Sequence, residues 1–318
     1  MSFWEKALKK TAACGKAFLG LVFFVCADLL VTFAFYFLNI NGKTYKGARN
    51  FVTCIAVFFA MFIFIKVSSG RGEPLVRMGK LTPDQIAALV VIGLGMIGMV
   101  VTYIGIADKI SEYLDSLKES IEEYRESMDR YSDTPAEIIP AWDAILYAFT
   151  LSFLTPITEE MVFRGVVFGE LRKAFGPWTS VILSALVFGV MHGITVHIGY
   201  AVACGLIIAA SYLITDSLYA PVILHMIFNF FGSGVANFMS VEAFGIQAET
   251  TRSAMIIINT ASIILMPFAV LAFVYLIAAK RKRAKAALEL ATEGGSQVEL
   301  AVEEKTVMSE DDGIEAKE

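Results

Sequence analysis

The sequence predicts an all-α fold, a polytopic membrane helical bundle with about eight transmembrane helices. Hydrophobic residues fill 57% of the 318 positions and mean hydropathy is +0.65, beyond the balance of a soluble domain. The apolar residues lie in long runs, and a helix needs about 20 of them to cross the hydrocarbon layer. Lysine and arginine cluster beside these runs, as they do next to membrane-spanning helices.

Eight apolar runs follow one another along the chain. They cover approximately residues 17–39, 50–68, 86–107, 141–172, 178–193, 196–214, 218–236 and 254–279. Pro156 interrupts the fourth run, so we expect a break into two helical pieces there. The fifth run is short and could enter the membrane without reaching its far face.

The distribution of charge predicts the orientation. If the spans alternate, the basic residues of the N-terminal leader, of the second and fourth connections and of the exit from the last span share one side. We therefore expect a multi-pass protein of the cell membrane with both termini in the cytoplasm. Lys43, Lys46 and Arg49 fall on the other side and argue weakly against this. No basic patch with interleaved aromatic residues indicates nucleic acid as a partner.

Composition divides the chain into five segments. We predict N-terminal membrane helices over 1–107, a polar amphipathic connection over 108–140, a membrane core with the candidate site over 141–236, a last membrane helix over 237–280 and a tail over 281–318. The tail is acidic and has few large apolar side chains. It cannot bury enough surface to offset its ordering entropy, so we expect it to be disordered.

The polar connection contains an apolar stripe at alternating spacings of four and three residues, typical of a coiled coil. The stripe consists of Ile110, Leu114, Leu117, Ile121, Tyr124, Met128 and Tyr131. One interpretation is a helix lying on the protein or membrane surface. The other is a helix that docks substrate or forms a dimer through residues 110–131.

Several polar residues within or near the spans have structural interpretations. Asp28 is expected to hydrogen-bond a neighbouring helix, and Asp143 to lie near enough to a span end to reach water. The four cysteines lack C-x-x-C spacing, so we expect buried structural thiols rather than a zinc cluster. They are Cys14, Cys26, Cys54 and Cys204.

Two adjacent carboxylates in the fourth run are candidates for chemistry, because an ionisable group at bilayer depth is costly to keep. Glu160 and Arg164 are four residues apart, so on a helix they share a face and can pair. Glu159 points about 100° away and lacks that local cation, which suits a general base. The structural alternative is a helix ion pair beside one acid in a polar cavity.

Two further segments carry polar side chains to a similar membrane depth. At ~1.5 Å per residue, Glu159, His192, His225 and Asn229 lie roughly 12–21 Å from the predicted cytoplasmic ends. His225 and Asn229 are four residues apart and share one helix face. The alternative readings are a satisfied core histidine for His192 and interhelical hydrogen bonding for His225 and Asn229. His197 is expected to be an interfacial histidine.

Three motifs in this order resemble those of the CAAX protease and bacteriocin-processing family, also called the Abi or type II CAAX prenyl endopeptidase-like family. They are Glu159-Glu160-x-x-x-Arg164, Phe188-x-x-x-His192 and His225-x-x-x-Asn229. The resemblance covers roughly residues 141–236 and implies a helical membrane fold that hydrolyses peptide bonds. It also implies that Glu159 and His192 activate a water while His225 and Asn229 stabilise the oxyanion.

In the same resemblance, Glu160 and Arg164 hold the site together. Whether a metal takes part is left open. Glu159, His192 and His225 could bind zinc and leave the fourth position free, as in catalytic zinc sites. The H-E-x-x-H spacing of zinc proteases is absent, so we expect a site that needs no cofactor, with zinc as the alternative.

The sequence therefore predicts an intramembrane endopeptidase that acts on a membrane-associated protein or peptide in the lipid bilayer. The rival is a non-catalytic membrane scaffold, or an immunity or regulatory protein, on the same fold. The full set of four site residues favours the enzyme. The identity of the substrate does not follow from the sequence.

Overall fold

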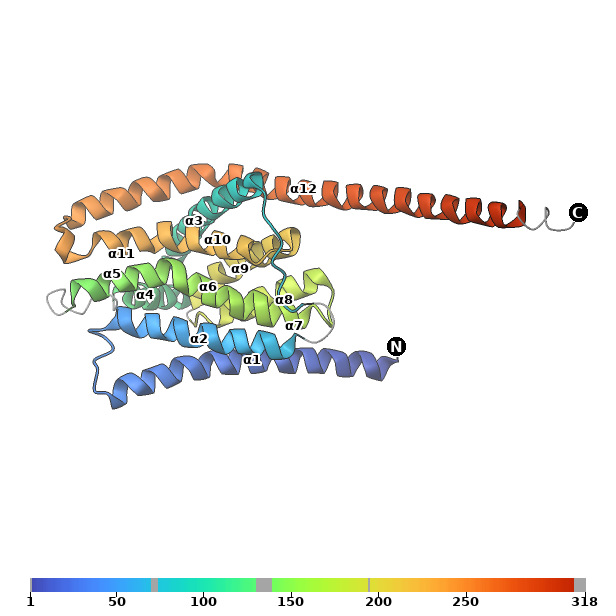
Figure 1. Ribbon diagram of the computed structural model, residues 1–318. Coiled ribbons are helices and arrows are strands. Elements are labelled where there is room, and N and C mark those ends of the chain that lie inside the picture. The colour runs from blue at the N-terminus through green and yellow to red at the C-terminus, as the bar shows by residue number, and fades with distance from the viewer. Residues whose placement is uncertain (1, 70–73, 130–138, 194, 312–318) are drawn as a thin grey trace, which may run out of the picture. The chain divides into compact units, whose positions relative to one another are not determined.

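The computed structural model of the protein describes residues 2–69, 74–129, 139–193 and 195–311. Within these ranges the chain is helical apart from turns, connections and one isolated β-bridge between Met78 and Ser217. The chain divides into two compact units, Met1–Phe273 and Val274–Glu318. The predicted all-α fold is confirmed (Figure 1).

Six described helical segments are long and apolar enough to cross a membrane, by length and composition. They are α1 (Phe3–Phe37), α2 (Lys46–Ser68), α3 (Pro83–Ser111), most of α9 (Thr195–Thr215), the segment Tyr219–Met239 and the first part of α12 (Ala248–Asp311). Helix α8 (Pro177–Val190) is apolar but shorter. Residues 141–171 form a further continuous helical segment, so each predicted span has a helical counterpart.

The segment 141–171 alternates between α and π turns. Its parts are α5 (Ala141–Phe149), the π-helix η2 (Thr150–Leu154), α6 (Thr155–Glu160), the π-helix η3 (Met161–Phe168) and α7 (Gly169–Leu171). The predicted break at Pro156 is wrong, because the chain stays helical through the proline. Proline lacks an N–H, and the wider turn that ends just before it accommodates the missing hydrogen bond.

A third π-helix follows the last polar motif. After α10 (Tyr219–Asn229) come the π-helix η4 (Phe230–Gly234), α11 (Val235–Met239) and the short 3-10 turn η5 (Glu242–Phe244). The π-helices therefore flank the two segments that carry the candidate carboxylates, His225 and Asn229. Single π turns are rare and concentrate at functional sites, and apolar periodicity does not reveal them.

Helix α2 is capped by a residue far away in the sequence. Its own N-cap residue, Tyr45, makes no side-chain cap. The Asp143 carboxylate of α5 instead accepts hydrogen bonds from the Gly47 N–H at 2.7 Å and the Ala48 N–H at 2.8 Å. A carboxylate at this position satisfies free donors and complements the helix dipole. Because Asp143 is only 1% exposed, the prediction that it reaches water is wrong.

The apolar core of the first unit lies where α1, α2, η3, α8 and α9 meet. Phe163, Phe168 and Tyr212 are among its largest buried side chains. Helix α1 runs antiparallel to α2 (Figure 1). The interhelical bond expected for Asp28 is confirmed, because the Thr53 hydroxyl donates to its Oδ1 over 3.5 Å.

The four cysteines divide between buried and exposed positions. Cys54 and Cys204 are buried, as predicted, whereas Cys14 and Cys26 on α1 are exposed and the prediction is wrong for them. Only 17% of the apolar window of α1 is buried by the rest of the protein. A helix with one packed face leaves the remaining apolar side chains for lipid, and both thiols lie on that remainder.

The basic connections of the first unit gather at one end of the bundle. Arg77 of the second connection forms an ion pair with Asp216, between α9 and α10, at 2.6 Å. Arg172 of the fourth connection donates to the Pro74 carbonyl at 2.8 Å, and Lys10 of the leader lies over an aromatic ring of the fourth connection. Three of the four predicted basic clusters thus share a side, while their assignment to the cytoplasm stays a prediction.

Helix α4 (Asp115–Asp129) uses part of the apolar stripe within its own chain. Ile121 is 3% exposed and packs with Val196 at the start of α9. Ile110 and Leu114 are 44% and 53% exposed, and Tyr131 lies outside the described residues. The surface-helix interpretation accounts for the buried part of the stripe, and a dimer through residues 110–131 stays a prediction.

The second unit consists of the end of α12 and the residues beyond it. The helix is assigned as far as Asp311, so it includes most of the predicted tail 281–318. The disorder of the tail stays a prediction.

Candidate active site

A fully buried ion pair forms the base of the candidate site. Arg164 Nη1 lies 3.0 Å from Glu160 Oε1, and both side chains are 0% exposed, so the pairing predicted from their spacing is confirmed. Arg164 Nη2 donates to the Gly205 carbonyl of α9 over 3.0 Å. Breaking such a pair would strand a charge in an apolar interior, which makes it a strong constraint on how η3 and α9 pack.

Glu160 also fixes the ring of His225. Its Oε1 lies 2.8 Å from His225 Nδ1. An ionised carboxylate only accepts hydrogen bonds, so Nδ1 is the donor. This bond selects the ring orientation and leaves Nε2 facing away from Glu160. Glu160 therefore joins α6 to α10, in addition to pairing with Arg164.

Glu159 lies on the other side of the same imidazole. Its Oε2 is 3.7 Å from His225 Nε2, beyond hydrogen-bonding distance, and its side chain is 21% exposed. No hydrogen bond to the Glu159 side chain is found within the described part of the chain. The two atoms face each other across a short gap, and Glu159 is the carboxylate of the motif with access to other molecules.

Phe188 of the second motif contacts residues of all three motifs. Its ring centre is 4.5 Å from that of His192, 5.9 Å from that of His225 and 4.7 Å from Arg164 Cζ. His192 Nδ1 lies 2.7 Å from the Phe188 carbonyl oxygen, which fixes that edge of the ring. No hydrogen bond or ion pair joins His192 to Glu159 in the described residues. His192 is therefore a neighbour of the site through Phe188 rather than a direct partner of the carboxylate.

Asn229 satisfies a backbone carbonyl that the π-helix leaves free. The N–H of Thr155 donates to Thr150, which closes the π turn, and Pro156 has no N–H to donate. The Leu151 carbonyl therefore lacks both of its usual intrahelical donors, and Asn229 Nδ2 donates to it over 3.0 Å. The amide keeps a second N–H for another acceptor. The sequence contained the signal, Pro156, but not the turn type that gives it this meaning.

The sequence interpretation quoted Phe188 only as part of the second motif, and it missed Gly205. A Cβ on Gly205 would lie 3.2 Å from Phe188 Cδ1 and 3.3 Å from the Ala185 backbone. Glycine thus lets α9 approach α8 closely enough for its carbonyl to reach Arg164. A glycine within an apolar helix is a weak signal, because many such glycines only serve close packing.

The geometry does not assemble the three donors considered for zinc. No group of three or more His, Cys, Asp or Glu side chains in the described residues could hold a metal ion. Glu159 and His225 face each other, whereas His192 is held at the Phe188 carbonyl and makes no hydrogen bond or ion pair with either of them in the described residues. The arrangement therefore does not fit the three-ligand zinc site.

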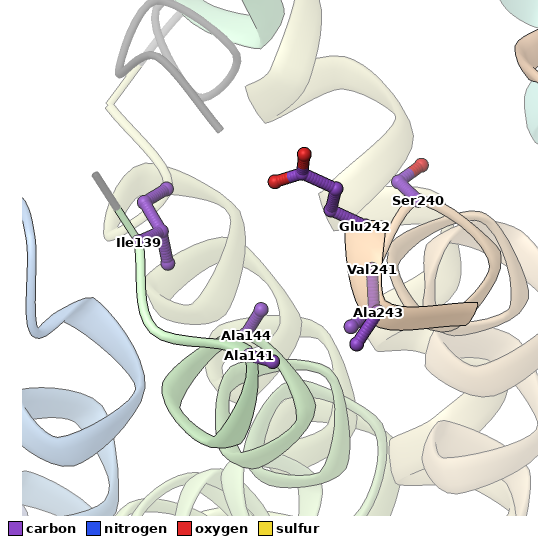
Figure 2. A pocket seen from close by; sticks show the side chains of 7 residues that line it. All are labelled: Ile139, Ala141, Ala144, Ser240, Val241, Glu242 and Ala243. Atoms are coloured by element: carbon purple, nitrogen blue, oxygen red, sulfur yellow. The ribbon is translucent and has the colours of Figure 1, made fainter. Parts of the chain in front are cut away.

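A cavity of about 320 Å³ lies elsewhere, between the start of α5 and the end of α11 (Figure 2). Ile139, Ala141 and Ala144 line one side, and Ser240 and residues 241–243 line the other. The Glu242 carboxylate is its charged group (Figure 2). None of the motif residues contributes to the cavity, so it is separate from the candidate site.

Comparison with known proteins points to one family. Residues 141–231 match the family described as type II CAAX prenyl endopeptidase Rce1-like. Over 101 residues the chain is 28% identical to the Bacillus subtilis (strain 168) protein named "Putative membrane peptidase YdiL". Over 105 residues it is 33% identical to the Staphylococcus aureus (strain USA300) protein named "Membrane-embedded CAAX protease MroQ". No solved structure matches the chain.

The similarity is confined to the part of the chain that holds the motifs. The aligned segments cover 31% of this chain and 41% and 42% of the two relatives. All seven motif residues lie inside the matched range: Glu159, Glu160, Arg164, Phe188, His192, His225 and Asn229. The resemblance to the CAAX protease family that the three motifs predict is therefore confirmed for residues 141–231.

Proposed function

We propose that this multi-pass membrane protein is an intramembrane endopeptidase that hydrolyses a peptide bond of a membrane-associated protein or peptide. The observation that carries the proposal is the position of Glu159 Oε2, 3.7 Å from an imidazole whose opposite nitrogen is held by Glu160. The printed names of the two relatives, a membrane peptidase and a CAAX protease, support the same reaction class.

In the proposed reaction Glu159 is the general base. It takes a proton from a water as the water oxygen attacks the scissile carbonyl carbon, which gives a tetrahedral oxyanion. The protonated Glu159 then returns this proton to the leaving nitrogen while the C–N bond breaks. The products are a carboxylic acid and an amine, and the enzyme returns to its starting state. The hydrophobic surroundings strengthen each of these polar interactions.

The other motif residues have separate proposed roles. His192 orients the attacking water through its Nε2, since Nδ1 is held at the Phe188 carbonyl. His225 donates from Nε2 to the oxyanion when both ring nitrogens are protonated, and the remaining N–H of Asn229 adds a second donor. Glu160 acts by holding His225 in place.

The proposed mechanism works without a metal, and zinc is the alternative. Metal analysis of the purified protein, combined with activity after treatment with a chelator, separates the two. Activity that is lost with the chelator and restored by stoichiometric zinc would contradict the metal-independent mechanism.

The direct test compares membranes that contain wild-type protein with membranes that contain the Glu159→Gln variant. Mass spectrometry of new peptide N-termini should find cleavage products in the first and not in the second. Glu249→Gln, the same change at an exposed position of α12, is the matched control and should cleave like wild type. Equal cleavage by Glu159→Gln and wild type would refute the assignment of the base.

A non-catalytic scaffold is the second candidate, and one observation favours it. His192 and Asn229 already make hydrogen bonds to backbone carbonyls, of Phe188 and Leu151, so each has a structural role in addition to the proposed one. A scaffold would retain its cellular effect in the Glu159→Gln variant. An enzyme would lose both the cleavage products and the effect.

The proposal extends to topology. We place both termini in the cytoplasm, because the leader and two basic connections share one end of the bundle. Single cysteines introduced at Ser2 or at Lys285, in a variant whose four native cysteines are replaced, are labelled with an impermeant reagent to test this placement. Labelling in intact cells would contradict it.

A further inference from the structure

His197, to which the sequence interpretation assigned no role, lies beside the second motif. Its ring centre is 4.7 Å from that of His192 at an interplanar angle of 61°, and 4.7 Å from that of Tyr200 at 23°. His197 and Tyr200 are three apart at the start of α9, so they share a helix face. The ring of His192 is therefore contacted by Phe188 of α8 and by His197 of α9.

The connection between α8 and α9 brings these rings together. Gly193 has a φ of +78°, a conformation that side chains rarely adopt, and it reverses the chain directly after His192. A Cβ on Gly189 would meet Val202 Cγ2 at 2.3 Å, so a larger residue there would separate the two helices. The sequence thus specifies a tight reversal that places His197 over the end of α8.

Helix α4 reaches the same rings from outside the matched segment. The Tyr124 ring centre is 6.3 Å from that of His197, at 81°, and 6.3 Å from that of Tyr200, at 85°. Tyr103 of α3 contacts Tyr200 from another side. We call this group the aromatic cluster, and its members are Tyr103, Tyr124, His192, His197 and Tyr200. Through this cluster, helix α4 of the polar connection contacts the residues beside the candidate site.

We propose that His197 is a positioning residue for His192 and that α4, through Tyr124, holds His197 in position. His192 lies beyond the last residue of α8, in a turn where its backbone N–H donates to the Gly189 carbonyl over 3.0 Å. One hydrogen bond at Nδ1 leaves its ring tilt to be set by packing, and Phe188 and His197 supply that packing. The inference rests on the proposed function only for its effect on cleavage.

The geometric part can be tested without a substrate. The chain has three histidines, so protein labelled with ¹³C-histidine in detergent micelles should give three ring signals. Tyr124→Ala removes a ring above His197, and we expect the signals of His197 and His192 to move while that of His225 stays. Tyr124→Phe keeps the ring, and Tyr113→Ala removes an 84% exposed ring of the same chain, so neither should move the His192 signal. An unmoved His192 signal in Tyr124→Ala would overturn the part assigned to α4.

The catalytic part uses a synthetic peptide that spans the cleavage site found by comparing wild-type and Glu159→Gln membranes. His197→Ala should lower kcat about tenfold with little change in KM, because small misplacements of a catalytic group cost rate rather than binding. His197→Phe keeps an aromatic ring in contact with His192 and should retain most of kcat.

The outcomes separate the inference from the proposed function. Wild-type kcat in His197→Ala, together with loss of cleavage in Glu159→Gln, would overturn the positioning role alone. A His197→Phe variant as slow as His197→Ala would show that a ring nitrogen, and not ring packing, matters, which also overturns the inference. Absence of any cleavage by wild type would refute the proposed function, while the ring signals would still test the geometry.

Discussion

The two carboxylates of the first motif are adjacent in sequence and differ in surroundings. Glu160 is completely buried, and its Oε1 serves both Arg164 and His225. Glu159 keeps 21% of its side chain exposed and faces His225 across 3.7 Å. A rotation of about 100° along one helix thus separates a carboxylate that binds Arg164 and joins α6 to α10 from one that can meet a substrate. The same substitution should therefore lower mainly cleavage at Glu159 and mainly stability at Glu160.

The largest expected effect is on turnover at Glu159. Glu159→Gln keeps the size of the side chain and removes the base, so cleavage should fall by about 10² to 10⁴-fold. The thermal unfolding temperature of the detergent-solubilised protein should stay near the wild-type value, because this side chain makes no hydrogen bond in the described structure. Peptide cleavage and unfolding are measured on the same preparation. A large drop in the unfolding temperature would show that Glu159 supports the fold instead.

The next largest effect is on stability at Arg164. Arg164→Met keeps much of the side-chain length and leaves Glu160 buried without its cation, which should cost about 3–5 kcal/mol. Unfolding of the purified variant in detergent measures this cost, with Arg252→Met as a control on α12. If Arg164→Met were as stable as wild type, the ion pair would not be the constraint described here.

A smaller loss of stability is expected at Asn229, which binds the Leu151 carbonyl and is also a proposed oxyanion donor. Asn229→Ala leaves the Leu151 carbonyl unsatisfied and should cost about 1–3 kcal/mol of stability, as well as one proposed oxyanion donor. Asn229→Asp removes both donor hydrogens at similar size. If either variant lost activity but kept full stability, the contact with Leu151 would be incidental.

The smallest of these effects is a loss of stability expected at Asp143, far from the site. Asp143→Asn retains one acceptor oxygen but loses the charge that caps α2, so stability should fall by about 1 kcal/mol. Cleavage per folded molecule should not change. Denaturant unfolding and peptide cleavage check the two statements separately, and a selective loss of cleavage would give Asp143 a part in the site.

The sequence predicted what depends on local spacing and composition. Helical periodicity placed Glu160 and Arg164 on one face, and long apolar runs were enough to predict the six described segments that can cross a membrane. The burial of Asp143 and the contact of His225 with Glu160 depend instead on which helices become neighbours. No pattern within one helix contains that information, because residues 96 and 65 positions apart must meet.

The exposed thiols of α1 were predicted wrongly for a related reason. Apolar composition shows that a helix avoids water, but it does not distinguish a face against protein from a face against lipid. In the sequence, Cys14 and Cys26 therefore cannot be told apart from Cys54. In the structure, Cys54 on α2 contacts the hydroxyls of Thr155 and Thr158, whereas Cys14 and Cys26 on α1 are exposed.

The π-helix at Thr150–Leu154 has a consequence for changes in chain length. A π turn contains one residue more than the α turn it replaces, so it behaves as a single-residue insertion within a helix. In a regular helix, one extra residue would turn everything upstream by about 100°, whereas the wider π turn takes up the extra residue and keeps the upstream part in register with the motif. Asp143 can therefore reach the first turn of α2 while Glu160 pairs with Arg164. Deleting one residue between 150 and 154 should leave both flanks in register but bring the Pro156 ring against the carbonyl four residues before it.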